Sequence, residues 1–236
     1  MIAVLREEGR AAPLADRGAA EGCATVSPSR TCSYLAVCVG LLLVGCANRM
    51  VTLRYQPDSR IQPVSGARQL TIFKFADRRG TEGDEGDPFR VGGIYGGYGN
   101  RLAKVMTGTP FQRTFNEALV AGFKARGIEA TGIPDREVAF GVLFETPLAL
   151  GGELRNFSTE SRWSKSAHIS GILRLYDRRG AVLVEKRISA RDQGGLGAGV
   201  FASPEPLEEL MNEALREFVR MVVMDPDLAA LIGAAP

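Results

Sequence analysis

Apolar residues with helical spacing form the clearest pattern in the chain, and they lie near its C-terminus. From Ser203-Pro204 onward they recur at intervals of three and four positions, which is the repeat of one face of an α-helix. So many exposed apolar side chains would form a larger patch than monomers usually tolerate. We therefore expect the stripe to be buried on a sheet rather than to dock a partner. Its members are Leu207, Leu210, Met211, Ala214, Leu215, Phe218 and Val222.

A second stripe of the same spacing predicts a helix from Thr109 to Gly127. Thr109 suits the N-cap, Pro110 suits the first helical position, and Gln112 completes the spacing of a capping box. Gly127 is placed to end the helix as a C-terminal cap. The apolar face comprises Phe111, Phe115, Ala118, Leu119 and Phe123.

Alternating apolar and polar positions predict strands before and after this helix. Residues 69–75 are rich in β-forming residues and run into the turn sequence Asp77-Arg78-Arg79-Gly80. Residues 152–158 predict a further strand. Another is predicted by the alternation of Val138, Phe140, Val142 and Phe144.

The clearest strand pair is an antiparallel hairpin. Residues 167–176 and 181–189 flank the sequence Asp177-Arg178-Arg179-Gly180. The octets 73–80 and 173–180 both end in Asp-Arg-Arg-Gly, which fits either an internal duplication or two strands with the same favourable turn. We favour the shared turn, because nothing outside the octets matches.

These elements predict a single domain of the α+β class over residues 68–236. A strand and a helix, then several strands, then a second helix are typical of a two-layer α/β sandwich. We expect a mostly antiparallel sheet with two helices on one face. The chain of 236 residues, 45% of them hydrophobic, has room for this domain and a processed leader.

An uncharged apolar run from Ser33 to Gly45 resembles the core of a bacterial signal peptide. It is shorter than the roughly 20 residues that a spanning helix needs, although a short buried helix or a plain membrane anchor is the alternative interpretation. The run ends in Leu43-Val44-Gly45-Cys46, which resembles a lipobox. We expect cleavage before Cys46 and attachment of acyl chains such as palmitate to that cysteine.

The residues around this leader predict no folded structure of their own. Residues 1–45 would comprise the signal peptide and an N-terminal extension that is either disordered or untranslated, and we favour translation from nearer Val26. Residues 46–67 contain Pro57, Pro63 and Gly66 and predict a lipidated cysteine followed by an extended linker.

Charge argues against a nucleic-acid-binding protein, and cysteine usage argues against a disulfide-rich one. The formal net charge is +2, and basic residues are interspersed with acidic ones, so we expect no nucleic-acid partner. All four cysteines lie at or before Cys46, so a disulfide framework is not expected in the domain.

Several of these features together resemble the YajG family of bacterial lipoproteins. They are the lipobox at Cys46, the strand entering Asp77-Arg78, the helix from Phe111 to Gly127, Trp163 before the hairpin, and the terminal helix ending in Asp225-Pro226-Asp227. The resemblance implies a periplasmic lipoprotein and no particular biochemical activity. Such features also occur in auxiliary lipoproteins of transport systems and of lipopolysaccharide assembly.

Residue types suited to catalysis are sparse. The single histidine, His168, lies at the start of a predicted strand, no cysteine follows Cys46, and no serine stands in a Gly-x-Ser-x-Gly motif. We therefore expect a protein that is not an enzyme and holds no cofactor or metal, with His168 packed on or exposed beside the hairpin.

The Gly-rich segment 80–100 predicts a mobile surface loop. Its residues 92–99 lack the Lys-Ser or Lys-Thr of a phosphate loop, so we interpret them as flexible chain. Its acidic side chains lack the spacing of a calcium loop and are interpreted as solvated; they are Glu82, Asp84, Glu85 and Asp87.

Three aromatic residues predicted in or near loops are candidates for binding a partner: Tyr95, Tyr98 and Trp163. For Trp163 the alternative is that it caps the core. We expect a membrane-anchored periplasmic module that binds or helps to assemble an envelope protein, with an envelope hydrolase or other enzyme as the alternative. Ala47 follows the lipidated position, where Asp would favour retention in the inner membrane, so we expect the periplasmic face of the outer membrane.

Overall fold

Three long antiparallel strands form the centre of the sheet: β7 (Leu148–Ser161), β8 (Ser164–Asp177) and β9 (Val182–Leu196). The structure is a computed structural model that describes residues 48–64, 68–80, 87–95, 98, 101–133, 146–161, 164–196 and 205–234. The predicted hairpin is confirmed and is longer than expected. Its turn is closed by the Asp177 carboxylate, which accepts the N–H groups of Arg179 and Ala181, both at 2.8 Å.

The other edge of β7 is shared by three short parallel strands in succession. β2 (Gln69–Phe73) pairs at Ala149 and Leu150, β3 (Ala76–Asp77) at Glu153 and Leu154, and β4 (Arg90–Tyr95) at Glu160 and Ser161. Beyond them, β6 (Glu129–Ile133) runs parallel to β2, β5 (Arg101–Thr107) antiparallel to β4, and β1 (Asn48–Val51) parallel to β5. The result is one mixed sheet of nine described strands.

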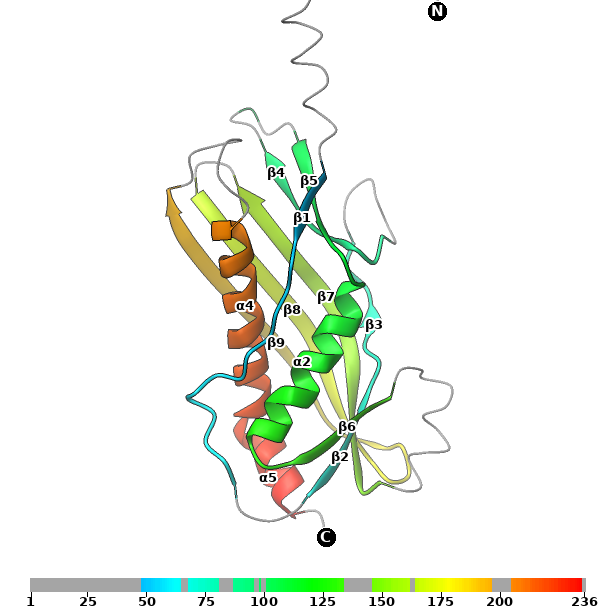
Figure 1. Ribbon diagram of the computed structural model, residues 1–236. Coiled ribbons are helices and arrows are strands. Elements are labelled where there is room, and N and C mark those ends of the chain that lie inside the picture. Colours follow the sequence, from blue (N-terminus) through cyan, green and yellow to red (C-terminus); the bar gives the residue numbers. More distant parts are fainter. Residues whose placement is uncertain are drawn as a thin grey trace, which may run out of the picture. The chain divides into compact units, whose positions relative to one another are not determined.

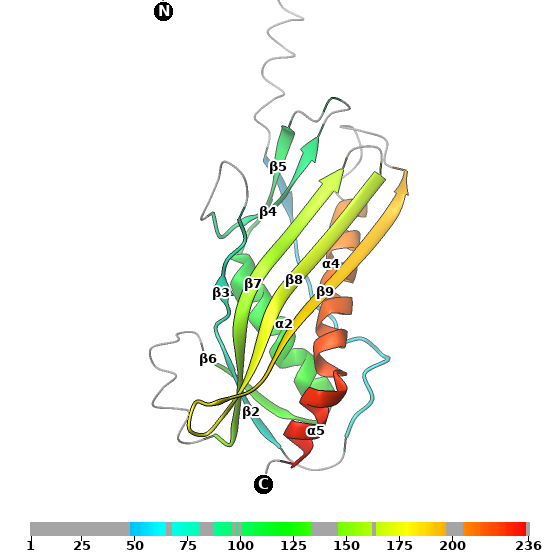
Figure 2. The same ribbon diagram turned by 180° about the vertical axis from the view of Figure 1, so that it is seen from behind.

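Helices cover one face of this sheet. α2 (Phe111–Ala125) and α4 (Glu205–Val223) lie side by side on it, and the short α5 (Pro226–Ala234) follows α4 (Figure 1). The view from behind shows β7, β8 and β9 in front of the helices, so among the described elements their other face carries no helix (Figure 2). The expected α+β sandwich with two helices on one face is confirmed.

Phenylalanine rings from both layers hold the sheet to the helices. Phe111 of α2 stacks on Phe157 of β7 with ring centres 4.0 Å apart. Phe115 meets Phe75 edge-on at 5.1 Å and Phe218 of α4 at 5.6 Å. All five rings are fully buried, so each removes a large apolar area from water as well as making a favourable aromatic contact.

The two predicted helices are confirmed, and one predicted cap is wrong. The apolar stripe of α4 is buried as expected, and Gly127 lies after α2 with a φ of +87°, in the left-handed region. The first turn of α2 has no side-chain cap, because Pro110 rather than Thr109 occupies the N-cap and has no side-chain acceptor; Gln112 donates to the carbonyl of Phe75. That bond ties the start of the helix to the sheet.

Two segments predicted to lack structure contain strands. β1 lies in the expected linker 46–67, and β4 lies in the expected mobile loop 80–100, where Val91, Gly92 and Gly93 are buried. A Cβ atom at Gly92 would collide with the backbone of Thr159 in β7, so the glycine there permits strand contact rather than mobility. The expected strand 138–144 lies outside the described residues, and the expected strand 152–158 is confirmed within β7.

Replacing Leu215 with Asp should unfold the domain. Leu215 is 0% exposed, so the variant would bury an unpaired carboxylate and lose a core side chain, at a cost of several kcal/mol against a typical total of about 5–15 kcal/mol. The matched control is Met221→Asp, because Met221 is 36% exposed on the same helix. Thermal melting by circular dichroism compares the two, and an unchanged midpoint for Leu215→Asp would contradict the burial of the stripe.

Candidate functional site

The chain enters the described fold through β1 and the segment that follows it, residues 52–64, which we call the strap. In Figure 1 the strap runs past α4 and α2 on the side of the helices away from the sheet. Leu53 and Tyr55 pack against the core, and Ile61 is buried. The strap ends at α2, where the N–H of Val64 donates to the last-turn carbonyl of Arg126 at 2.8 Å. This part of the expected linker is therefore built into the domain.

Backbone amides of the strap are matched to side chains of α4. The N–H of Thr52 donates to Glu208 Oε2 at 2.8 Å, and the N–H of Arg54 donates to Asn212 Oδ1 at 2.9 Å. The two donors are two residues apart on extended chain, a distance of about 6.6 Å, and the two acceptors are four residues apart on the helix, about 6.0 Å. The donors and acceptors therefore have nearly the same spacing. The strap therefore runs alongside α4 in a fixed register.

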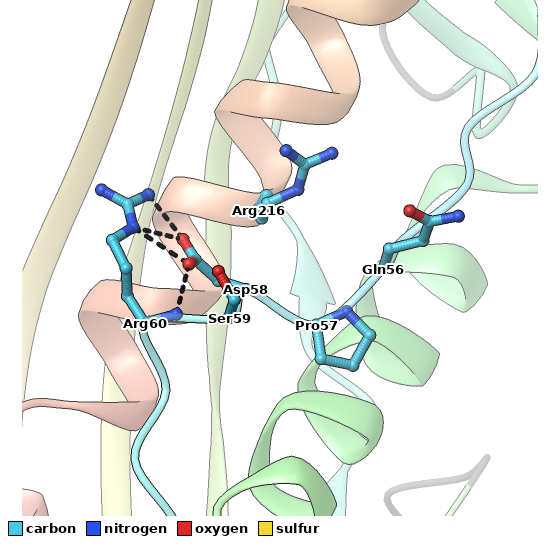
Figure 3. Close-up of a pocket in the computed structure, with 6 residues that line it drawn as sticks. All are labelled: Gln56, Pro57, Asp58, Ser59, Arg60 and Arg216. Atoms are coloured by element: carbon cyan, nitrogen blue, oxygen red, sulfur yellow. Dashed lines mark hydrogen bonds and ion pairs between the residues drawn. The ribbon is translucent and has the colours of Figure 1, made fainter.

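Below this ladder lies a polar hollow of about 360 Å³, lined by residues 56–60 of the strap and by Arg216 of α4 (Figure 3). The guanidinium of Arg60 donates to the Asp58 carboxylate through Nε at 2.9 Å and Nη2 at 2.5 Å. These hydrogen bonds lower the pKa of Asp58 to about 2. Arg60 Nη2 also reaches Glu217 of α4 at 3.3 Å. Asp58 thus orients Arg60 within the strap, and Arg60 joins the strap to Glu217 of α4; we call these three residues the clasp.

Tyr55 lies on the opposite side of the strap, toward α2. Burial raises the pKa of its hydroxyl to about 12, so the ring remains neutral at physiological pH. A Cβ atom at Gly122 of α2 would lie 3.1 Å from this hydroxyl and 2.5 Å from Val219 Cγ1 of α4. The absence of a side chain at Gly122 therefore lets the strap and both helices approach closely.

The predicted lipidation site stands next to this arrangement in the sequence. Leu43-Val44-Gly45 and Cys46 lie outside the described residues, so cleavage and lipidation stay predictions. Asn48 is already paired with Lys104 of β5. The described fold therefore begins two positions after Cys46, with Ala47 alone between them.

Two of the three aromatic residues predicted to bind a partner belong to one hairpin. Tyr95 ends β4 and is half-buried, whereas Tyr98, in the connection to β5, is fully exposed. Trp163 lies outside the described residues. Because β1 runs parallel to β5, this hairpin lies at the end of the domain where the chain enters from Cys46. Their role in binding stays a prediction.

The sheet face without helices carries a side-chain cluster that the sequence did not indicate. His168 of β8 contacts Asn156 of β7 through Nδ1 and Ser189 of β9 through Nε2, both at 2.8 Å. Burial, and then the charge of Arg191, lower the pKa of His168, which favours the neutral imidazole. Strand pairing alone brings these residues together, so no local sequence signal could have revealed the cluster.

The cluster has the residue types of a Ser-His-Asn relay. Asn156 and Ser189 each occupy one ring nitrogen of His168, and the nitrogen that carries the proton is set by which way the Asn156 amide is turned. The contacts satisfy the imidazole and assign no direction of proton transfer.

Among the described residues, the remaining candidate ligands form no group that could hold a metal ion. Glu82, Asp84 and Glu85 lie outside the described residues, and the carboxylate of Asp87 accepts the N–H of Phe89 at 3.0 Å within a turn. Within the described ranges, no three Asp, Glu, His or Cys side chains are grouped to hold a metal ion. The helices described here include none that is long and apolar enough to cross a membrane.

Comparison with known proteins supports the fold. No protein-family model and no curated protein matches the sequence. Among solved structures, a protein of family DUF330 from Xanthomonas campestris is similar with a TM-score of 0.53 at 13% identity, over 79% of this chain and 96% of that one. At this identity the likeness shows a shared fold and nothing about activity.

Two solved lipoproteins are similar at a lower level. A putative lipoprotein from Caulobacter crescentus has a TM-score of 0.36 at 16% identity, over 52% of this chain and 83% of that one. A lipoprotein from Neisseria meningitidis has a TM-score of 0.34 at 12% identity, over 64% of this chain and 96% of that one. At these scores neither likeness carries an argument about this chain.

Replacing Asp58 with Asn should loosen the strap and lower the melting temperature by several degrees at neutral pH. Because the pKa of Asp58 is lowered in the folded state, its stabilisation is present above about pH 4 and is lost as the pH falls through about 2. The difference in unfolding free energy between the wild type and Asp58→Asn should therefore shrink over that window.

The matched control is Glu117→Gln, which removes an exposed ion pair with Arg113 on α2. Exposed pairs contribute little, so its stability should stay close to wild type at every pH. Denaturant titrations between pH 2 and 7 provide the measurement, and a pH-independent difference for Asp58→Asn would contradict the proposed clasp.

Proposed function

We propose that this chain is a lipid-anchored lipoprotein of the bacterial envelope, similar to the YajG family, that binds or helps to assemble an envelope protein without catalysis. The observation that carries the proposal is where the fold begins. Asn48 is the first described residue and is already in the sheet, two positions after Cys46 of the lipobox-like sequence. Cleavage before Cys46 would therefore leave every described element intact.

The cellular location that we propose is based on Cys46 and Ala47. Acyl chains on Cys46 contribute about 0.8 kcal/mol for each buried methylene, so several chains hold a domain on a bilayer without a spanning helix. With Ala47 rather than Asp after the cysteine, we place the protein on the periplasmic face of the outer membrane.

The face of β7, β8 and β9 that no described helix covers is the surface on which we expect the protein partner (Figure 2). It carries polar groups ordered by cross-strand contacts, beside a small apolar cluster of Phe73, Ala149 and Tyr176. Arg174 Nη1 lies 3.2 Å from Glu153 and its Nε 2.5 Å from Glu185, and the His168 cluster continues along the same strands. Positioned polar groups on a rigid sheet favour recognition of a specific protein surface.

An envelope hydrolase is the second candidate, and the contact between His168 and Ser189 is the observation that favours it. The position of Ser189 argues against it, because Ser189 lies within the regular strand β9 rather than in the sharp strand-to-helix turn of a nucleophile elbow. We therefore prefer the binding module.

Replacing Cys46 with Ala should abolish processing and anchoring. We expect intact-mass spectrometry of the membrane fraction to show a wild-type protein that begins at an acylated Cys46 and a variant that keeps its leader. The matched control is Cys38→Ala, since Cys38 lies within the leader and outside the cleavage motif, and it should be processed normally. A fully processed, membrane-bound Cys46→Ala protein would contradict the lipid anchor.

The hydrolase alternative is tested with an esterase substrate and a fluorophosphonate probe on the purified protein. We expect no turnover and no labelling in the wild type, because Ser189 lies within a regular strand rather than in a nucleophile elbow. Turnover that survives purification and disappears in Ser189→Ala would replace the binding module with a hydrolase.

A further inference from the structure

The start of β1 and the β4–β5 hairpin form one end of the domain, which we call the anchor end. Strand register defines it, because Asn48 is opposite Lys104 of β5 and Lys104 is opposite Gly93 of β4. The hairpin continues past this row, beyond the point where β1 begins. We propose that the anchor end lies on the phospholipid headgroups of the bilayer that holds the acyl chains of Cys46. The inference rests on the proposed lipidation of Cys46.

Chain length leaves little freedom for any other position. Only Ala47 separates Cys46 from Asn48, and two residues of chain span at most about 7 Å. On β4, Ile94 and Tyr95 extend about 6.6 Å past the row of Asn48 before the hairpin turns, and β4 is only two strand spacings, about 10 Å, from β1. The hairpin thus extends as far past Asn48 as the fully extended chain from Asn48 to Cys46 does. The connection is therefore too short to lift the hairpin far from the bilayer that the acyl chains of Cys46 enter.

The direction of β1 is fixed, so the domain does not swing away from this contact. All four residues of β1 pair with β5, and the next residue, Thr52, is hydrogen-bonded to Glu208 of α4. Farther along the chain, Arg60 of the strap forms an ion pair with Glu217 of α4 at 3.3 Å. The lipid would therefore be joined to a rigid part of the domain rather than to a tether.

The side chains of the anchor end suit a headgroup layer. Tyr98 has a relative exposure of 103%, and a tyrosine ring with its polar hydroxyl is well accommodated at a membrane interface. The row of register partners that begins at Asn48 continues through Glu160 of β7 to Ser166 of β8. Arg101 of β5 and Lys165 of β8 lie beyond this row, toward the anchor end. The described strand residues beyond that row include no acidic one, so the end has the charge that anionic headgroups attract.

Spin labels at the two ends of the domain test the orientation. After lipidation the mature chain has no free thiol, because its only cysteine is Cys46, so Tyr98→Cys and Arg178→Cys each provide one labelling site. Arg178 is exposed in the β8–β9 turn at the opposite end of β8 and is the matched control. The acylated full-length mature protein is reconstituted in vesicles of phosphatidylethanolamine with a minority of phosphatidylglycerol.

Collision of each nitroxide with oxygen and with a water-soluble nickel complex is measured by electron paramagnetic resonance. We expect the label at 98 to be shielded several-fold from nickel relative to the label at 178, with higher access to oxygen. Equal access to nickel at both positions, with Cys46 shown by mass spectrometry to be acylated, would overturn the orientation and leave the proposed function standing. An unacylated Cys46 would overturn both.

Discussion

The sheet depends on β7, because this strand is hydrogen-bonded along both edges. Its partner on one edge is antiparallel, whereas those on the other edge are parallel. One edge is paired with β8 over the full length of the strand, whereas the other is divided among β2, β3 and β4. A register shift between Leu154 and Asn156 marks a bulge between the β3 and β4 pairings, and bulges bend a strand. At Gly152, a Cβ atom would collide with the carbonyl of Ile172 in β8. The bend and the glycine let one strand support two separate branches of the sheet.

The parts of the fold that could be predicted are those whose signal is local. The apolar faces of α2 and α4 repeat every three to four residues, and the β8–β9 hairpin is flanked by alternating strands around a turn led by Asp177. Each pattern is contained within about twenty consecutive residues, so it can be recognised without knowledge of the partner. At Asp77 the carboxylate accepts the N–H of Arg79 at 3.2 Å, as Asp177 does from Arg179, but the bond between Gly180 and the Asp177 carbonyl that closes the hairpin turn is not among those described at Asp77. The shared origin of the two octets as a favourable turn stays a prediction.

The strands that were missed are stabilised by distant partners. β4 contains two consecutive glycines, which by composition indicate a loop, yet they are buried because β7 approaches closely there. The strap contains Pro57 and Pro63, which are typical of linkers, and its backbone is satisfied by side chains of α4. The His168 cluster has the same origin, since its three residues come from three strands. Only the exposure of Tyr98 followed from the local composition of its loop.

The strap also sets the order in which the chain can complete its structure. Thr52 and its partner Glu208 are 156 positions apart, so the contact that fixes the strap forms only when nearly the whole chain is present. Until then, Thr52 and Arg54 have no α4 on which to dock, whereas β1 already has its partner in β5. Docking of the last long helix therefore fixes the strap after the sheet that it crosses has formed.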